Sequence, residues 1–330
     1  MEIKKINWLM VGAFALHIVV SLVLYHYPDM FEIGILLNLS LGELMLLLPM
    51  AVYLLCWKMG QCKHASVAEE DAEKGEPQTL RERLHYNKVK PSTLLYALIF
   101  TWLSMPLTTL INAISMLFVD NTVMMLSEQI LGVAFPVMLF FMAVVPAFCE
   151  ETMFRGIVYG GYRKRGNKFA AVMLSGFLFG IMHMNLNQAL YAFVIGVLLA
   201  LLFEATNSIW PTILFHFVYN AQSCCLMYFV EELVPGFYSN PANLEAATAA
   251  TDLYSMIAVY IIIAAICTPL AICMLYKIAK NEGRVEQLKE TLPGKRESKA
   301  RIATVSFWVA TVLAVGFIVY DILLSYGIVA

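Results

Sequence analysis

Long uncharged apolar runs separated by short polar segments make up most of this chain. A helix needs about 20 predominantly apolar residues to cross a membrane, and against this requirement we assign nine segments as membrane-spanning helices: Ile6–Tyr25, Ile33–Trp57, Leu94–Phe118, Met124–Tyr162, Phe169–Met184, Ala189–Phe203, Ile209–Val230, Leu253–Tyr276 and Ile302–Ala330. The sequence therefore predicts an all-α fold, a polytopic transmembrane helix bundle of about nine transmembrane helices.

The first and fourth segments have unusual lengths. The first follows Lys4 and Lys5 as a signal peptide would, but its apolar run is too long and no small-residue cleavage site follows before His26, so we expect a retained anchor. The fourth is longer than one membrane crossing and contains Pro136 and Pro146.

The lysines and arginines alternate between the two sides of this bundle. With the N-terminus inside, the segments 1–5, 58–90, 163–168 and 277–301 hold every basic residue except Arg155. The outside loops 26–32, 119–128, 185–188 and 231–252 contain none. Basic residues are enriched in cytoplasmic loops, so we expect a cytoplasmic N-terminus.

Composition supports a membrane protein and excludes other classes. The chain is 60% hydrophobic and 14% charged, with a mean hydropathy of +0.73. The net charge of −2 includes no basic block interleaved with aromatic residues, so we expect no nucleic-acid partner. The seven cysteines form no CxxC pair, which argues against a disulfide framework or a thiolate zinc site. We expect an integral, multi-pass protein, in the plasma membrane if the source is bacterial.

A cluster of polar residues falls inside the predicted spans. Glu150, Glu151 and Arg155 lie on the fourth span, and Glu151 and Arg155 are spaced i, i+4 for a local ion pair, which leaves Glu150 without a local partner. His183 lies at a similar depth on the fifth span, roughly 22 Å from the basic turn. His216 and Asn220 point from one face of the seventh.

These residues contrast with single polar residues in other spans, which more often hold helices together. We interpret five of those as structural: His17, Asn38, Glu43, Asn112 and Asp321. An ionised carboxylate at mid-membrane costs on the order of 3 kcal/mol. Two adjacent acids together with two histidines, an arginine and an asparagine therefore indicate function.

The cluster suits hydrolysis of an acyl bond. A poorly hydrated carboxylate is a suitable general base for water, and an imidazole with an amide can stabilise an oxyanion. We prefer no cofactor, but Glu150, His183 and His216 would be the ligands if the reaction needed zinc. Two other classes stay open: a non-catalytic scaffold or immunity protein, and a transporter, against which the absence of paired repeats argues.

Three short motifs occur in order on successive predicted helices: EExxxR at 150–155, FxxxH at 179–183 and HxxxN at 216–220. Together they resemble the CPBP family of CAAX proteases and bacteriocin-processing membrane proteins, also called the Abi family. The resemblance covers roughly residues 94–230, the CPBP-like catalytic helix core. Residues 1–93 would add two helices and the polar cytoplasmic loop 58–90, and residues 231–330 an acidic outer loop and two helices joined by the charged loop 277–301.

The resemblance implies an intramembrane endopeptidase of the Rce1-like type. It implies that Glu150 and His183 activate water, that His216 and Asn220 stabilise the oxyanion, and that Glu151, Arg155 and Phe179 support the site. The partners implied are the lipid bilayer and a membrane-proximal or lipidated peptide substrate, such as a CAAX-type, signalling or bacteriocin peptide. The mechanism preferred is glutamate-activated hydrolysis, with a zinc metalloprotease as the alternative.

Overall fold

A computed structural model describes residues 2–27, 34–67, 78–165, 167–240, 242–243, 250–294 and 301–328. These residues form helices and connecting turns, and no strand occurs among them. The helices are α1 (Glu2–His26), α2 (Ile35–Val67), α3 (Leu80–Arg83), α4 (Pro91–Ser115), α5 (Thr122–Met125), α6 (Ser127–Leu131), α7 (Phe135–Leu139), the π-helical η2 (Phe140–Val144), α8 (Val145–Glu151), the π-helical η3 (Thr152–Tyr159), α9 (Gly160–Arg165), α10 (Lys168–Ile181), α11 (Leu186–Thr206), α12 (Trp210–Leu233), α14 (Ala250–Asn281), α15 (Val285–Lys289) and α16 (Val305–Ser325).

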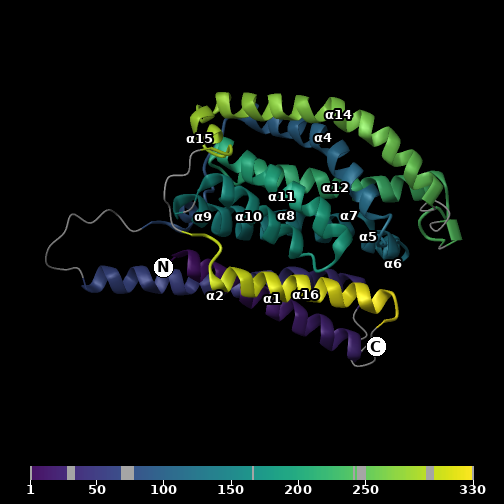
Figure 1. The fold of residues 1–330 in the computed structure, drawn as a ribbon, viewed down its shortest axis with the longest axis horizontal. Coiled ribbons are helices and arrows are strands. Elements are labelled where there is room, and N and C mark those ends of the chain that lie inside the picture. The colour runs from purple at the N-terminus through teal and green to yellow at the C-terminus, as the bar shows by residue number, and fades with distance from the viewer. Residues whose placement is uncertain are drawn as a thin grey trace.

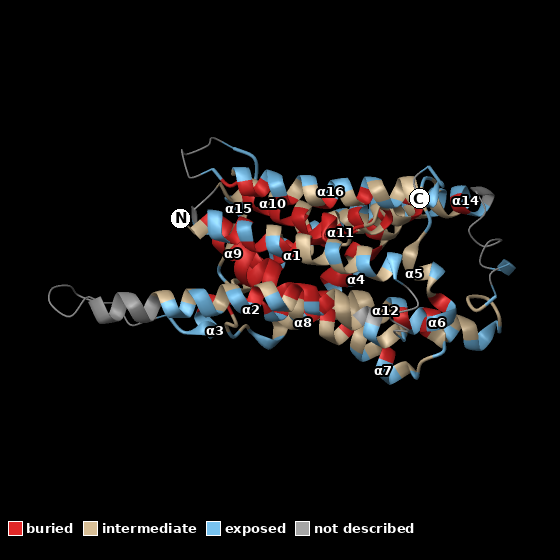
Figure 2. Cartoon of the chain, turned by 90° about the horizontal axis from the view of Figure 1, so that it is seen from below, coloured by how far each residue is buried: buried red, intermediate tan, exposed pale blue. Residues whose placement is uncertain are grey.

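The long helices lie in three layers, as Figure 1 shows. Helices α14 and α4 pack together on one side, and α1, α2 and α16 form the layer on the other, where the first and last helices of the chain are neighbours. Helices α8 to α12 lie between them. Figure 2 shows that burial concentrates in this middle layer. The middle layer is thus the part of the molecule in which side chains can be shielded from lipid.

Within the described residues, eight helices are long and apolar enough to cross a membrane, and the protein is an integral, multi-pass membrane protein. The all-α polytopic prediction is confirmed, but the fifth predicted span, 169–184, is the 14-residue helix α10, which is too short to count among these eight. It is about 21 Å long. It ends where Met184 adopts φ 55° and Asn185 caps the next helix by accepting a hydrogen bond from Gln188 N.

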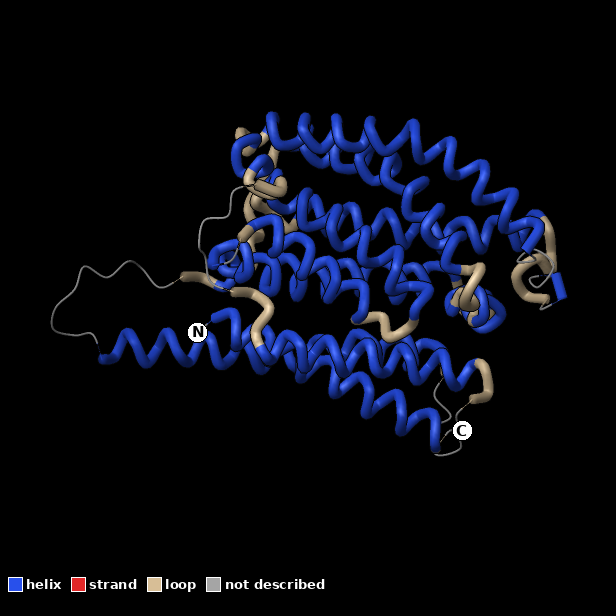
Figure 3. The backbone as a smooth tube through the Cα atoms, viewed as in Figure 1, coloured by secondary structure: helices blue, strands red, loops and turns tan. Residues whose placement is uncertain are grey.

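The fourth predicted span begins later than expected. Residues 122–131 form the two short helices α5 and α6, and the membrane-length helix runs from Phe135 to Lys164. Figure 3 shows that helices make up most of the described chain and that loops lie mainly at their ends. Proline inside a helix removes one backbone hydrogen bond, and Pro146 follows directly on the π-helical segment η2. A π-helical turn is one way in which a continuous helix absorbs such a break.

The basic segments meet at one end of the bundle, around a single buried acid. Glu204 is 1% exposed. Its carboxylate pairs with Arg163 at 2.9 Å, with Lys168 at 2.9 Å and with Arg284 at 3.3 Å. Tyr159 also donates a hydrogen bond to it, at 3.0 Å. The structure thus gathers parts of the predicted inside segments 163–168 and 277–301 at one end, while the compartment that this end faces stays a prediction.

The segments predicted as loops contain helical structure. Helix α2 continues to Val67, α3 forms within the polar segment 58–90, and α14 and α15 extend into the segment 277–301. The acidic cluster around Asp71 and the outer-loop residue Glu245 lie outside the described residues. In the outer loop, Glu231 accepts hydrogen bonds from the backbone of Gly236 and Tyr238, so this part of the loop has a defined turn.

Candidate active site

Glu151 is the centre of the polar cluster. Its side chain is fully buried, and its Oε1 accepts hydrogen bonds from Arg155 Nη1 at 3.0 Å and from His216 Nδ1 at 2.9 Å. The i, i+4 ion pair expected from the sequence is therefore present. The Glu151 carboxylate thus joins the helix Phe135–Lys164, which carries both glutamates, to α12.

Arg155 and Phe179 pack against each other within the cluster. Arg155 is 2% exposed, and its Nη2 donates to the carbonyl of Gly196 on α11 at 3.3 Å. Its guanidinium carbon lies 4.3 Å from the centroid of the Phe179 ring. The same ring meets His183 and His216 edge to face, at centroid distances of 5.5 and 5.9 Å. Phe179 thus sets the position of both imidazoles relative to the arginine.

The hydrogen bonds of the two histidines fix their tautomers. His183 Nδ1 lies 3.0 Å from the carbonyl oxygen of Phe179, and a carbonyl can only accept. His183 Nδ1 therefore carries the proton, and in the neutral ring Nε2 keeps its lone pair. The same argument applies to His216, whose Nδ1 donates to the Glu151 carboxylate. Each neutral ring can take a proton at Nε2, and a protonated ring can donate from it.

Asn220 lies one turn beyond His216 on α12. Its Nδ2 donates to the carbonyl of Met142, at 3.1 Å, in the π-helical segment η2. A carboxamide has two N–H donors and one acceptor oxygen, so one N–H and the oxygen of Asn220 remain for a ligand. This bond also ties α12 to the helix that carries the glutamates.

Glu150 has a different environment from its neighbour. It is 7% exposed, and its Oε2 is buried without a hydrogen-bond partner among the described residues. The charges that act on it are those of Glu43, Glu151 and Arg155. The i, i+4 spacing left Glu150 without a local partner, and the histidine on α12 bonds Glu151 rather than Glu150. A continuous helix that contains π-helical turns changes the angle between successive side chains, and such turns are frequent at functional sites.

Glu43 on α2 is an acid that the sequence analysis did not connect with this cluster. It is buried, the thiol of Cys149 hydrogen-bonds to its carboxylate, and its Oε2 has no partner among the described residues. It therefore lies beside Glu150 rather than isolated in its span. One sequence feature could have indicated a role for Glu43: it lies in the middle of an apolar run, where an ionisable residue is expected to have a function.

Close packing of α10 on α11 holds Phe179 and His183 in place. A Cβ atom added at Gly180 would lie 2.6 Å from the carbonyl of Ala189, and one added at Gly196 would lie 2.8 Å from the Cα of Gly176. Small residues four apart allow membrane helices to approach this closely. The same contact brings the Gly196 carbonyl to Arg155.

The residues do not form a metal-binding group. Among the described residues, no set of three or more histidine, cysteine, aspartate and glutamate side chains is arranged to hold a metal ion. Both histidines of the set considered for zinc use Nδ1 for a hydrogen bond and keep Nε2 free, which is also how zinc-binding histidines are held. The choice between a zinc and a glutamate mechanism therefore stays a prediction.

Comparison with known proteins identifies the segment that carries the cluster. Residues 132–222 match the family model described as Type II CAAX prenyl endopeptidase Rce1-like. This segment, called the Rce1-like segment below, is similar to that family. It contains all three motifs and the residues from Glu150 to Asn220, so the resemblance read from the motifs is confirmed.

One curated relative matches over a shorter length. The "Putative membrane peptidase YdiL" of Bacillus subtilis (strain 168) is 33% identical over 87 residues, which is 26% of this chain and 36% of the relative. The match thus spans about a third of that relative's length. No solved structure matches the chain. Glu43 lies outside the Rce1-like segment, on a helix that the family match does not cover.

Proposed function

We propose that the protein is an intramembrane endopeptidase that hydrolyses a peptide bond in a membrane-associated or lipid-modified peptide. The proposal places the reaction at the Rce1-like segment. A CAAX-type peptide is the first substrate class to test, because the family description names a CAAX prenyl endopeptidase. Signalling and bacteriocin peptides are the other classes.

One observation carries the proposal: the buried carboxylate of Glu150 accepts no hydrogen bond from the described residues, whereas Oε1 of the neighbouring Glu151 accepts one from Arg155 and one from His216, and only Oε2 of Glu151 is without a partner. A buried acceptor without a partner is costly. Glu151 is held by an arginine and a histidine, which suits a supporting role. Glu150 is free to hold a water molecule, which suits a general base.

The proposed reaction uses these groups in sequence. Glu150 takes a proton from water as its oxygen attacks the carbonyl carbon of the peptide bond, and the carbonyl oxygen becomes an oxyanion. The free N–H of Asn220 and the imidazole of His216 stabilise that oxyanion. Glu150 then passes its proton to the leaving amine as the carbon–nitrogen bond breaks. His183, whose Nε2 can accept, assists proton transfer at the water.

Cleavage by purified protein in detergent or vesicles tests the proposal. Reporter peptides with a prenylated C-terminal cysteine, their unmodified forms and a membrane-tethered sequence would be assayed with wild type, Glu150→Gln and Asp321→Asn. Asp321 is also an acid in an apolar helix, but it lies on α16, away from the Rce1-like segment. We expect Asp321→Asn to cleave normally and Glu150→Gln to lose cleavage by a factor of at least about 100.

Two results would argue for other functions. Equal cleavage by Glu150→Gln and wild type would show that Glu150 is not required for hydrolysis. Failure of the folded wild type to cleave any reporter, together with unchanged biological activity of Glu150→Gln in cells, would support the non-catalytic scaffold.

A further inference from the structure

A groove of about 1070 Å³ lies between the basic ends of α1 and α2, outside the Rce1-like segment except at one residue. Its walls include Leu9 and Gly12 of α1 and Leu48 and Val52 of α2. A Cβ atom added at Gly12 would meet no atom within 4 Å, so the groove is open at this point. This space is separate from the acid cluster around Glu151.

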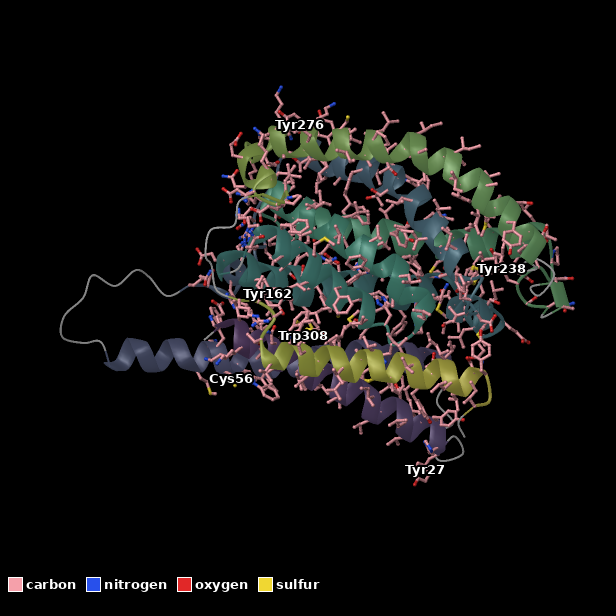
Figure 4. All side chains as sticks on the ribbon, viewed as in Figure 1. Tyr27, Cys56, Tyr162, Tyr238, Tyr276 and Trp308 are labelled. Carbon is pink, nitrogen blue, oxygen red and sulfur yellow. The ribbon has the colours of Figure 1, made fainter. Side chains whose placement is uncertain are left out.

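The apolar part of the groove faces lipid. Leu48 and Val52 are well exposed although they lie in a membrane-length helix. Cys56, which also lines the groove, is labelled in Figure 4 on the outer surface of α2. A ligand can therefore enter from the bilayer, and hydrocarbon chains are the material present there.

The other part of the groove carries positive charge. Lys5, Arg83 and Lys164 line it together with one acid, Glu2, so three cations face one anion. Glu2 pairs with Arg83 at 2.7 Å. Lys5 and Lys164 are exposed, and neither forms an ion pair with any described residue. Two cations thus remain for an anionic ligand.

Arg83 adds a donor that the protein leaves unused. Its side chain is 3% exposed, with Nη1 on Glu2 and Nη2 on the hydroxyl of Tyr53 at 2.8 Å. Its Nε is buried without a partner. A buried charged donor without a partner is costly, and phosphate oxygens are strong acceptors for a guanidinium group. The groove therefore contains an unused charged donor that a phosphate group would satisfy.

Aromatic residues set the level of the groove in the membrane. Trp8 and Trp57 line it, and the guanidinium carbon of Arg83 lies 5.7 Å from the centroid of the Trp57 ring. Tryptophan is enriched at the level of the lipid headgroups. Basic pockets between membrane helices at this level are suited to anionic headgroups.

We propose that this groove binds one anionic phospholipid, with its phosphate at Lys5, Arg83 and Lys164 and its acyl chains along Leu9, Gly12, Leu48 and Val52. The site requires no catalytic residue, so it stands independently of the peptidase proposal. Bound there, the lipid would join α1, α2, α3 and α9 at the basic end of the bundle.

Tryptophan quenching in vesicles tests this binding. The full-length protein would be reconstituted with brominated phosphatidylglycerol or with brominated phosphatidylcholine of the same acyl chains, at equal mole fractions. We expect phosphatidylglycerol to quench preferentially, with an apparent affinity at least about tenfold higher, because two unpaired cations face its headgroup. Added salt should weaken the preference.

Variants of the groove residues, each with a matched control, test whether the lipid preference arises at this groove. Lys5→Gln combined with Lys164→Gln should abolish the preference, and Gly12→Phe should block binding by filling the open space. Lys280→Gln changes an exposed lysine on α14 in the opposite layer, and Gly316→Phe changes a glycine with nothing within 4 Å on α16. Neither control should change the quenching.

Four outcomes would overturn the proposal. Equal quenching by the two lipids, or equal loss in test and control variants, would leave ordinary contact with bulk lipid as the explanation. Competition by inorganic phosphate alone would show an anion site without a lipid. Displacement by a prenylated peptide, without any preference for phosphatidylglycerol, would make the groove a substrate site.

Discussion

His216 Nδ1 lies 2.9 Å from Glu151 Oε1, and this single contact joins helices whose residues are 65 positions apart in the chain. It assigns the second glutamate of the motif to the task of orienting a histidine as well as holding Arg155. When one ring nitrogen of a histidine donates a hydrogen bond to a carboxylate, the other ring nitrogen is the one that can face a substrate. The two adjacent glutamates therefore have different surroundings, and different consequences follow when each is changed.

We expect Glu151→Gln to destabilise the protein more than Glu150→Gln does. Glu151→Gln removes a buried charge from between Arg155 and His216, and breaking a buried pair costs about 3–5 kcal/mol. Glu150→Gln removes no such pair. Thermal unfolding in detergent, followed by circular dichroism, would compare the two variants. Equal melting temperatures would contradict this division of the two acids.

Chelation should leave cleavage unchanged. Among the described residues, no three histidine, cysteine, aspartate or glutamate side chains are arranged to hold a metal ion. Activity would be measured after prolonged dialysis against a strong chelator and again after addition of Zn²⁺. Loss on dialysis with recovery on zinc addition would establish a metal enzyme and reject the glutamate mechanism.

Replacement of Glu43 by leucine should reduce cleavage without reducing stability. Glu43 keeps a buried oxygen without a partner, and replacing such a group by an apolar one is often neutral or stabilising. Its position beside Glu150 gives it access to the proposed reaction. Melting temperature and cleavage rate of Glu43→Leu would be measured in the same preparation. Normal cleavage would assign Glu43 to helix packing alone.

Glu204 should be far more important for stability than exposed acids at the same end. It contacts three basic side chains and a tyrosine hydroxyl, so Glu204→Gln should cost about 3–5 kcal/mol. Glu286 pairs with Lys289 at the surface, and Glu286→Gln should change stability by less than about 0.5 kcal/mol. Melting temperatures of the two variants provide the comparison, and similar losses would refute the central role of Glu204.

His85 should make the fold sensitive to acid. Burial, together with the charges of Arg163, Lys164 and Arg83, lowers the pKa of His85 from 6.5 to about 3. The unfolded chain therefore binds more protons between pH 6.5 and 3, and stability falls as pH falls through this window. The loss at pH 5 should be about 1 to 2 kcal/mol.

His85→Asn tests this origin of acid sensitivity. His85 has φ 59°, and asparagine tolerates that conformation and does not titrate. Melting temperatures at pH 7 and pH 5 would be compared with those of wild type. The variant should lose less stability between the two pH values, and an identical loss would place the acid sensitivity elsewhere.

The sequence identified interactions that are local or that follow from composition. Apolar runs gave the long helices, and the i, i+4 spacing gave the pair of Glu151 and Arg155. Alternation of basic residues anticipated that Arg163 and Arg284 would lie at one end of the bundle. Each of these depends on spacing or hydrophobicity, which can be read directly from a chain.

Interactions that depend on helix rotation could not be read in this way. Which of two adjacent glutamates meets His216 depends on the rotation of a helix that contains π-helical turns. Glu204 looked unremarkable because its cations come from two segments that are distant in the sequence, 163–168 and 277–301. Glu43 likewise acts on Glu150 from a helix far away in the sequence. The short α10 was assigned as a full span because hydrophobicity does not report where a helix ends.

The shortness of α10 has a consequence for the depth of His183. Its 14 residues span about 21 Å, whereas the hydrocarbon core of a typical bilayer is about 30 Å thick. Helix α10 lies in the middle layer, none of its residues is exposed, and His183 follows it closely. A helix that starts at the basic end of the bundle and is shorter than the hydrocarbon core ends inside the level of the membrane. The length of α10 thereby sets the depth at which His183 lies.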